Sequence, residues 1–268
     1  MKLSISNIAW SEAHDEEMYD FLSKAGFEGI EIAPTRIFGE DPYSKLAEAR
    51  TFHKMLEEVY HLEISSIQSI WYGRNENIFS SAAERTSLLE YTQRAFIFAH
   101  ELGCKNLVFG CPRNRNIDSA GDRNIAVEFF RYLGELAEQQ NTVLALEANP
   151  VIYSTNFLNY TDETYEFVKM VDSSGIKLNY DLGTVIENRE SVGQLSEMID
   201  KVNHVHISEP YLAQVNYTVM HKELVEVLRE NNYSKYVSIE MKNMDDLSMV
   251  KERIKQLSSL VRKQEYEC

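Results

Sequence analysis

Short runs of apolar and β-branched residues alternate along the chain with longer stretches in which apolar residues recur every three or four positions. The short runs have the length of buried strands, and the longer stretches have the periodicity of amphipathic helices. Eight strands are predicted in this way, at residues 3–8, 29–33, 64–70, 106–110, 143–147, 177–181, 204–208 and 236–240. The helical stretches between them include EEMYDFLSKAG, SKLAEARTFHKMLEEVYH, ERTSLLEYTQRAFIFAHELG and AVEFFRYLGELAEQQ. Strands and helices in regular alternation predict a parallel sheet covered by helices.

Eight such units can close on themselves. An open parallel sheet would leave two edges exposed, whereas a closed barrel has none. The pattern therefore predicts an α/β protein with a single (β/α)8 TIM barrel. The 268 residues fall within the size range of this fold. No linker, charge block or low-complexity stretch divides the chain, so we expect one domain over residues 1–268.

Metal-ligand residue types stand at the ends of the last four predicted strands. Glu147, Asp181, His206 and Glu240 lie in the segments VLALEANP, IKLNYDLGT, VNHVHISEP and YVSIEMKN. Because the C-terminal ends of barrel strands meet at one mouth, these side chains are expected to be neighbours. Three carboxylates and an imidazole suit Mn²⁺, Mg²⁺, Co²⁺ or Zn²⁺, and the carboxylates would repel one another without a cation. We therefore predict that the four residues hold one divalent metal ion.

Any one of these carboxylates alone would more simply be a helix cap or a surface group, so the prediction depends on all four. The choice of histidine is a second inference. His204 and His206 share one strand face because side chains two apart point the same way. His206 is preferred as the ligand because it is nearer the end of the strand, and His204 is left to support it or to pack in the core.

The segments ALEANP, LNYDLGT, HVHISEP and VSIEMK, with GFEGIEIAP near the start, resemble the xylose-isomerase-like barrel superfamily of sugar and sugar-phosphate isomerases and epimerases. The resemblance covers essentially the whole chain and implies the same four metal ligands. It also implies, from the ketose 3-epimerases of that superfamily, that Glu147 and Glu240 act as a paired acid and base. The expected activity is a metal-dependent isomerisation or epimerisation of a small sugar or sugar-derived ketone through a metal-stabilised enediolate.

Two departures from the superfamily pattern leave the reaction open. Thr184 stands where many members have the histidine of D-x-x-H, and the loop EPYLAQVNYT lacks an arginine that epimerases often use on the substrate. An inositol-type ketone dehydratase of the same superfamily and a noncatalytic sugar-binding barrel therefore remain alternatives. The missing histidine argues against an abasic-site endonuclease, since that branch uses it in a zinc cluster.

Five further residues are candidates for substrate binding. Trp71 could stack on a sugar face or pack in the core, and Asn149 shares the strand face of Glu147. Arg113 and Arg115, in CPRNRN, could bind a phosphate or carboxylate or simply be solvated. Glu209 could orient a ligand or form an ion pair. Weaker candidates at the predicted mouth are Asn7, Trp10, Glu31, Arg36, Gln68, Ser69, Tyr72 and Lys242.

Composition restricts the partners. Lys and Arg total 27 against 42 Asp and Glu, a formal net charge of −15 that repels nucleic acid and anionic membranes. The segment MKLSISNIAW lacks signal-peptide features and no apolar run has membrane-spanning length, so we expect a cytoplasmic protein without a membrane partner. Cys104, Cys111 and Cys268 are expected to be reduced thiols. Nucleotide-binding glycine motifs and a serine-hydrolase elbow are absent. Barrels of this type often form homo-oligomers, but no apolar stripe demands one here.

Overall fold

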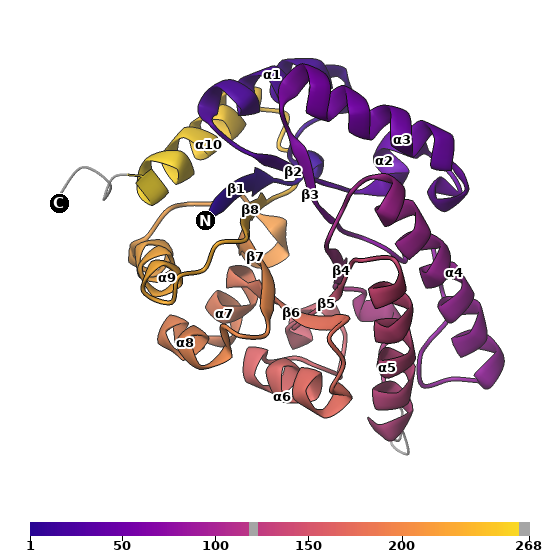
Figure 1. The fold of residues 1–268 in the computed structure, drawn as a ribbon. Coiled ribbons are helices and arrows are strands. Elements are labelled where there is room, and N and C mark those ends of the chain that lie inside the picture. The colour runs from indigo at the N-terminus through magenta and orange to yellow at the C-terminus, as the bar shows by residue number, and fades with distance from the viewer. Residues whose placement is uncertain (118–122, 263–268) are drawn as a thin grey trace.

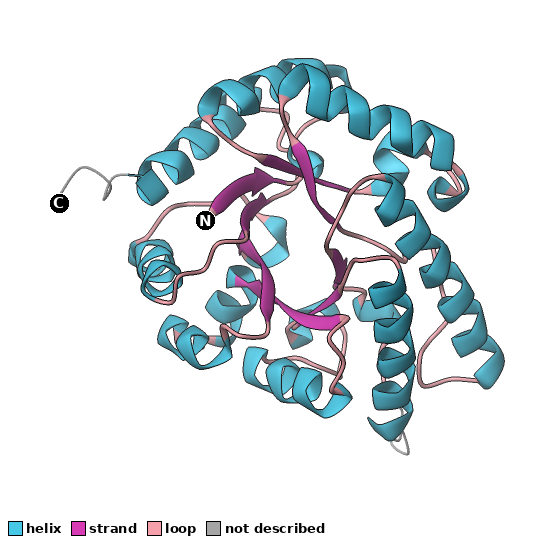
Figure 2. Cartoon of the chain, in the orientation of Figure 1, coloured by secondary structure: helices cyan, strands magenta, loops and turns pink. Residues whose placement is uncertain are grey.

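The structure, a computed structural model, describes residues 1–117 and 123–262. Eight parallel strands lie at the centre and helices surround them (Figure 1; Figure 2). The strands are β1 (Lys2–Ile5), β2 (Gly29–Ile32), β3 (Glu63–Ile67), β4 (Leu107–Phe109), β5 (Leu144–Glu147), β6 (Ile176–Asp181), β7 (Val202–Ser208) and β8 (Tyr236–Glu240). The helices are α1 (Asp15–Ala25), α2 (Pro34–Phe38), α3 (Leu46–Met55), α4 (Ala82–Glu101), α5 (Arg123–Gln139), α6 (Thr161–Val171), α7 (Leu182–Asn188), α8 (Leu195–Met198), α9 (Val219–Glu230) and α10 (Leu247–Arg262).

The sheet is a nearly closed barrel, as the strand–helix alternation predicted. The strand order is β1-β8-β7-β6-β5-β4-β3-β2, and every pair is parallel. β1 pairs with β8 from Lys2 opposite Tyr236 to Ile5 opposite Ile239. Between β1 and β2 the barrel is closed by an isolated bridge from Ser6 to Glu31 and by the Glu28 N–H, which donates to the Leu3 carbonyl oxygen at 3.1 Å. The first and last helices, α1 and α10, lie side by side over this junction (Figure 1).

All eight predicted strands are present, but β1 and β3 each end three residues before their apolar runs, and β2 and β4 end one residue before theirs. The run at 3–8 stops being a strand at Ile5, because the Ser6 hydroxyl accepts the Ile8 N–H and starts a 3-10 turn. The run at 64–70 stops at Ile67, and Ser69 has a left-handed backbone with φ of 54°. The segments that follow β1 and β3 therefore turn at the mouth of the barrel, where their polar side chains can contribute to a site.

The interior of the barrel is unusually polar. Ser4 hydrogen-bonds Ser65, with 2.5 Å between the hydroxyl oxygens, and Asn106 donates to the hydroxyl of Ser66 at 2.9 Å. These residues are almost completely buried, while aliphatic and aromatic side chains fill the layer between the strands and the helices. A polar interior next to an apolar outer layer can support charged groups at the mouth without leaving them unpaired.

No helix in the described ranges is both long and apolar enough to cross a bilayer. Cys104 is a buried free cysteine, and Cys111 is a partly buried one. Burial raises the pKa of the Cys104 thiol to about 12, so it stays protonated. Cys268 lies outside the described residues.

Candidate active site

The four predicted metal ligands come together at the C-terminal ends of β5 to β8. One ligand atom each from Glu147, Asp181, His206 and Glu240 lies within 4.8 Å of all the others. The centre of the group is His206, whose Nδ1 lies 3.0 Å from Glu147 Oε2 and 3.3 Å from Glu240 Oε2. The imidazole is fully buried, whereas the carboxylates of Glu147 and Glu240 are about one-tenth exposed. The carboxylates can therefore be reached from the mouth.

Asp181 is held by the end of its own strand. It is the last residue of β6 and the N-cap of α7, so its carboxylate accepts the Thr184 N–H at 2.8 Å. The Thr184 hydroxyl lies 2.9 Å from the same Oδ2, and the Ser208 hydroxyl donates to Oδ1. Thr184, which replaces the histidine of the superfamily pattern, thus helps to orient Asp181.

Glu147 is oriented by two amides and a glycine. Asn149 donates to Oε1 at 3.0 Å, and Asn179 donates to Oε2 at 2.6 Å. Gly110, at the end of β4, leaves room for this carboxylate, since a Cβ added there would lie 2.8 Å from Glu147 Oε1. The glycine is needed here for close approach and not for an unusual backbone angle.

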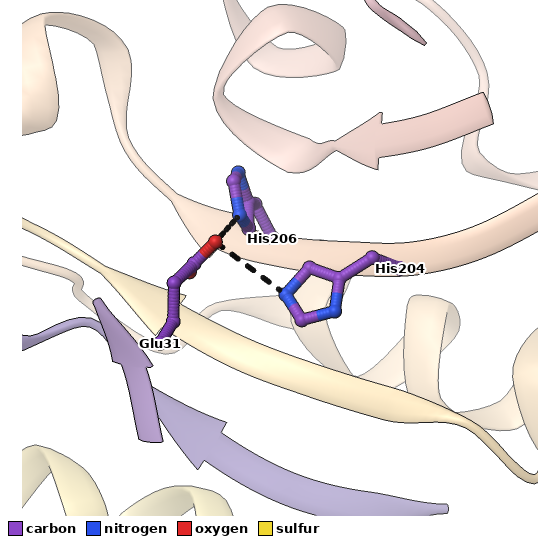
Figure 3. Close-up of side chains that lie close together, drawn as sticks. All are labelled: Glu31, His204 and His206. Carbon is purple, nitrogen blue, oxygen red and sulfur yellow. Dashed lines mark hydrogen bonds and ion pairs between the residues drawn. The ribbon is translucent and has the colours of Figure 1, made fainter. Parts of the chain in front are cut away.

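The far side of His206 faces the barrel interior. Its Nε2 lies 3.0 Å from Oε1 of Glu31 (Figure 3). Oε2 of Glu31 accepts a hydrogen bond from the Ser238 hydroxyl. His204 Nε2 lies 3.8 Å from the same Glu31 Oε1, and within residues 1–117 and 123–262 neither ring nitrogen of His204 has a hydrogen-bond partner. A carboxylate on one imidazole nitrogen fixes the ring so that the other nitrogen can face a metal. Glu31, whose role the sequence did not decide, contacts His206.

The charges in this cluster are unbalanced. Burial is the main cause that raises the pKa of Asp181 to about 6, and repulsion from the Glu147 carboxylate is the next. Burial also raises the pKa of Glu240 to about 7. Burial alone would lower the pKa of His206, but Glu31 and Glu240 outweigh it and hold that pKa well above its usual value. Four carboxyl groups therefore surround one imidazole. Their oxygen and nitrogen donors fit a divalent cation, which would offset the excess negative charge.

A cavity of about 590 Å³ opens over this cluster. It is bounded by Glu147, Asp181 and Glu240 and by four of the five predicted substrate-binding residues, Trp71, Arg113, Asn149 and Glu209. Trp71 is only 2% exposed, because its ring packs edge-on against Phe109 and its Nε1 donates to Thr92 Oγ1 at 2.8 Å. Trp71 therefore packs in the core and also borders the cavity.

Arg115 is the fifth candidate, and its position corrects the expectation of direct substrate binding. It is fully buried and does not line the cavity. Its guanidinium donates to the carbonyl oxygen of Glu147 at 2.8 Å and of Leu158 at 3.4 Å, and lies 5.4 Å from the centre of the Phe109 ring. Burial lowers the pKa of Arg115 to about 10. The residue therefore supports the backbone that carries Glu147.

Three residues at the site were missed from the sequence. Asn179 and Ser208 lie two positions from Asp181 and His206 on the same strand faces, so strand alternation could have found them. Tyr153 lines the cavity from a 3-10 turn after β5, and its hydroxyl accepts the Tyr211 N–H at 2.8 Å. No periodic pattern marks a residue in such a turn.

The comparisons with known proteins agree with this architecture. Among solved structures, the chain is similar to a D-psicose 3-epimerase, with a TM-score of 0.80, 20% identity and coverage of 98% of this chain and 99% of that one. It is also similar to the 3-keto-D-glucoside 4-epimerase of E. coli, with a TM-score of 0.77, 21% identity and coverage of 96% and 98%. A probable 3-DHS dehydratase of Bacillus anthracis gives a TM-score of 0.70, 21% identity and coverage of 96% and 99%.

At these identities the likeness to solved structures concerns the fold. A comparison with functionally curated protein sequences found no match. The family model of the xylose isomerase-like TIM barrel matches residues 19–263, which is most of the chain. The chain therefore belongs to the xylose isomerase-like TIM barrel family.

Proposed function

We propose that the protein is a divalent-metal-dependent isomerase or epimerase of a small sugar or sugar-derived ketone. The observation that carries this proposal is the convergence of Glu147 and Glu240 on one imidazole beneath a cavity of sugar-binding size. The activities named for the similar solved structures, a D-psicose 3-epimerase, a 3-keto-D-glucoside 4-epimerase and an L-ribulose 3-epimerase, support the same class.

Glu147, Asp181, His206 and Glu240 would hold the cation. A divalent ion bound there supplies a Lewis acid that polarises a substrate carbonyl and an adjacent hydroxyl. Asp181 and His206 would serve only as metal ligands, because their side chains are fixed in place. Thr184 and Ser208 hydrogen-bond the Asp181 carboxylate, and Glu31 contacts the His206 ring. Glu147 and Glu240 are both partly exposed to the cavity and remain available for a second task.

That task is proton transfer. Inverting a carbon next to a carbonyl requires one group to remove its proton and another to return a proton from the opposite side. Glu240 is suited to either step, because its carboxylate is partly exposed to the cavity and burial raises its pKa, to about 7 in the metal-free protein. Glu147 is suited to the complementary step, since Asn149 and Asn179 hold one oxygen each.

Residues in the cavity wall would orient the substrate. Trp71 borders the cavity, and Asn149 has a buried Oδ1 that lacks a hydrogen-bond partner among the described residues and could accept a sugar hydroxyl. Arg113 is exposed at the cavity and could reach an anionic substituent, and Glu209 could accept hydroxyl hydrogens.

The test is metal content together with solvent-proton exchange at the carbon next to the carbonyl of fructose, psicose, tagatose and ribulose, with Mn²⁺, Mg²⁺ or Co²⁺ added. We expect one bound ion per chain and exchange with at least one ketose, reduced by more than 100-fold in Glu240→Gln. Glu166→Gln, in an exposed glutamate that pairs with Lys169, is the control. Absence of a bound ion, or unchanged exchange in Glu240→Gln, would sink the proposal.

Dehydration is the second candidate, and the similarity to a probable 3-DHS dehydratase favours keeping it. The same removal of a proton next to a carbonyl can expel a β-hydroxyl group as water. An inositol-type ketone that loses water in product analysis would assign the chain to this reaction. Sugar binding without turnover on either panel would instead support the noncatalytic barrel.

A further inference from the structure

We propose that a second cavity at the barrel mouth binds a second, uncharged sugar ring, so that the preferred substrate is a glycoside or disaccharide. The inference rests on the proposed function for the reacting ring and adds a substrate class to it. Its basis is a second hollow next to the cavity over Glu147, Asp181 and Glu240.

The second cavity has a volume of about 680 Å³ and is formed by residues that follow β1, β2 and β3, with a wall from α4. Its lining includes Ile8, Thr35, Arg36, Asp41, Pro42 and Tyr91. Ser69, Tyr72 and Gly73 line both cavities, so this one segment forms the border between the two hollows. Together they extend over the ends of all eight strands.

The border between the cavities is open. Tyr72 is 70% exposed, so its ring is not packed across the border. Gly73 has a φ of 80°, and apart from its two chain neighbours no described residue lies within 4 Å of the place where its Cβ would be. An exposed tyrosine between two hollows provides an apolar face with a polar tip, which suits a sugar ring.

Size supports an extended ligand. Small-molecule sites usually occupy about 300–1,000 Å³, and each cavity lies in this range. One monosaccharide held at Glu147 and Glu240 would leave the second cavity to solvent. A ligand with two linked rings could place the reacting ring over the carboxylates and the other beside Tyr72 in the second cavity.

The charges favour an uncharged ring over a phosphate. Among the described residues lining the second cavity, Arg36 is the one cation, and it is occupied by two hydrogen bonds to Asp15 at 3.2 and 2.7 Å and one to the Trp10 carbonyl. Asp41 is paired with Arg94 at 3.1 Å. The hydroxyls of Thr35 and Ser69 remain for hydrogen bonds with a polyol.

The test measures binding by calorimetry to the full-length, Mn²⁺-loaded protein. The probes are maltose, cellobiose, lactose and sucrose, each compared with its component monosaccharides. Thr35→Trp fills the second cavity, and Thr51→Trp makes the same change on the exposed face of α3. Tyr72→Ala removes the ring at the border without filling either cavity. Circular dichroism checks that each variant is folded.

We expect at least one disaccharide to bind more than 10-fold more tightly than its components. Thr35→Trp should remove this advantage and change monosaccharide affinity by less than twofold, and Tyr72→Ala should weaken the disaccharide selectively. Thr51→Trp should change neither. Equal affinities for disaccharides and monosaccharides, or an unchanged advantage in Thr35→Trp, would overturn the inference.

Because the measurement is binding, this test is separate from that of the reaction. Selective disaccharide binding without proton exchange would contradict the proposed function and uphold the second subsite. Proton exchange on ketoses by a protein that does not prefer disaccharides would uphold the proposed function and contradict the second subsite.

Discussion

Glu31 and His206 lie on β2 and β7, which are separated in the sheet by β1 and β8, and yet Glu31 Oε1 is 3.0 Å from His206 Nε2. The contact crosses the barrel interior (Figure 3). It leaves Nδ1 of the same ring to face Glu147 and Glu240 at the mouth. A buried carboxylate near the N-terminus of the chain thus orients a residue at the centre of a cluster built from the C-terminal half.

Replacing Glu31 should therefore weaken metal binding although Glu31 is not in the four-residue cluster. Glu31→Ala removes the acceptor at Nε2, and we expect a 10- to 100-fold loss of Mn²⁺ affinity, the usual effect of losing such a support. Glu31→Gln keeps an acceptor oxygen and should lose less. Calorimetry with Mn²⁺ measures both, with the exposed Glu48→Gln as control. Parental affinity in Glu31→Ala would show that the ring is held by other contacts.

The fold was predictable from the sequence because the apolar runs and the helical periodicity agree along the whole chain. Strand alternation also put His204 and His206 on one face, and both lie inside the barrel with Glu31. Strand alternation could not predict which of Arg113 and Arg115 is exposed and which is buried. They occupy an irregular loop, where a spacing of two does not determine direction, and one is exposed while the other is fully buried.

The second prediction concerns pH. The pKa of Asp181 is raised to about 6 and that of Glu240 to about 7, from usual values of 3.8 and 4.5. The folded, metal-free protein therefore binds these protons more tightly than the unfolded chain, and this contribution to stability is lost as the pH rises from about 4 to 7. The pKa of His206 is also raised, so its contribution to stability is likewise lost as the pH rises, but at higher pH. The depressed pKa of Glu31 matters only in the acid range, where its contribution is lost as pH falls.

Metal binding should have the opposite pH dependence, because the cation requires deprotonated ligands. We expect the gain in melting temperature on adding Mn²⁺ to increase steadily between pH 5 and pH 8. Thermal melts with EDTA or Mn²⁺ at each pH measure this gain. Glu240→Gln should flatten the dependence, since it removes one of the titrating groups. A gain that does not vary with pH would contradict the electrostatic description of the cluster.

The third prediction concerns the space left by Gly110. A Cβ at this position would lie 2.8 Å from Glu147 Oε1, so Gly110→Ala must displace the carboxylate. We expect at least a 10-fold loss of ketose proton exchange, with a change in the free energy of unfolding of about 1 kcal/mol or less. Gly193→Ala is the matched control, because its nearest contact, Ser191 Oγ, is at an ordinary 3.5 Å. Equal activities of the two variants would mean that the orientation of Glu147 is not critical.

The fourth prediction separates the two arginines of the loop after β4. Arg115 is buried and donates to the carbonyl oxygens of Glu147 and Leu158, so Arg115→Met would remove one donor from each, although the Leu158 oxygen keeps the Asn149 N–H at 3.0 Å. An unsatisfied buried group costs about 1–3 kcal/mol, and we expect the free energy of unfolding to fall by about 2–4 kcal/mol. Arg113→Met, on the exposed residue two positions away, should change it by about 0.5 kcal/mol or less. Urea unfolding measures both variants.

Steady-state kinetics should also distinguish Arg113 from Arg115. Arg113 lines the cavity, so Arg113→Met should raise the KM for ketoses with an anionic substituent more than for neutral ones. Arg115→Met, where it folds, should lower kcat for both kinds of substrate, because the backbone under Glu147 moves while the cavity wall keeps its charge. Arg115→Lys keeps the charge but not the planar fork of donors, and should fall between the parent and Arg115→Met in stability. An Arg115→Met protein as stable as the parent would mean that its guanidinium is not required to hold the end of β5.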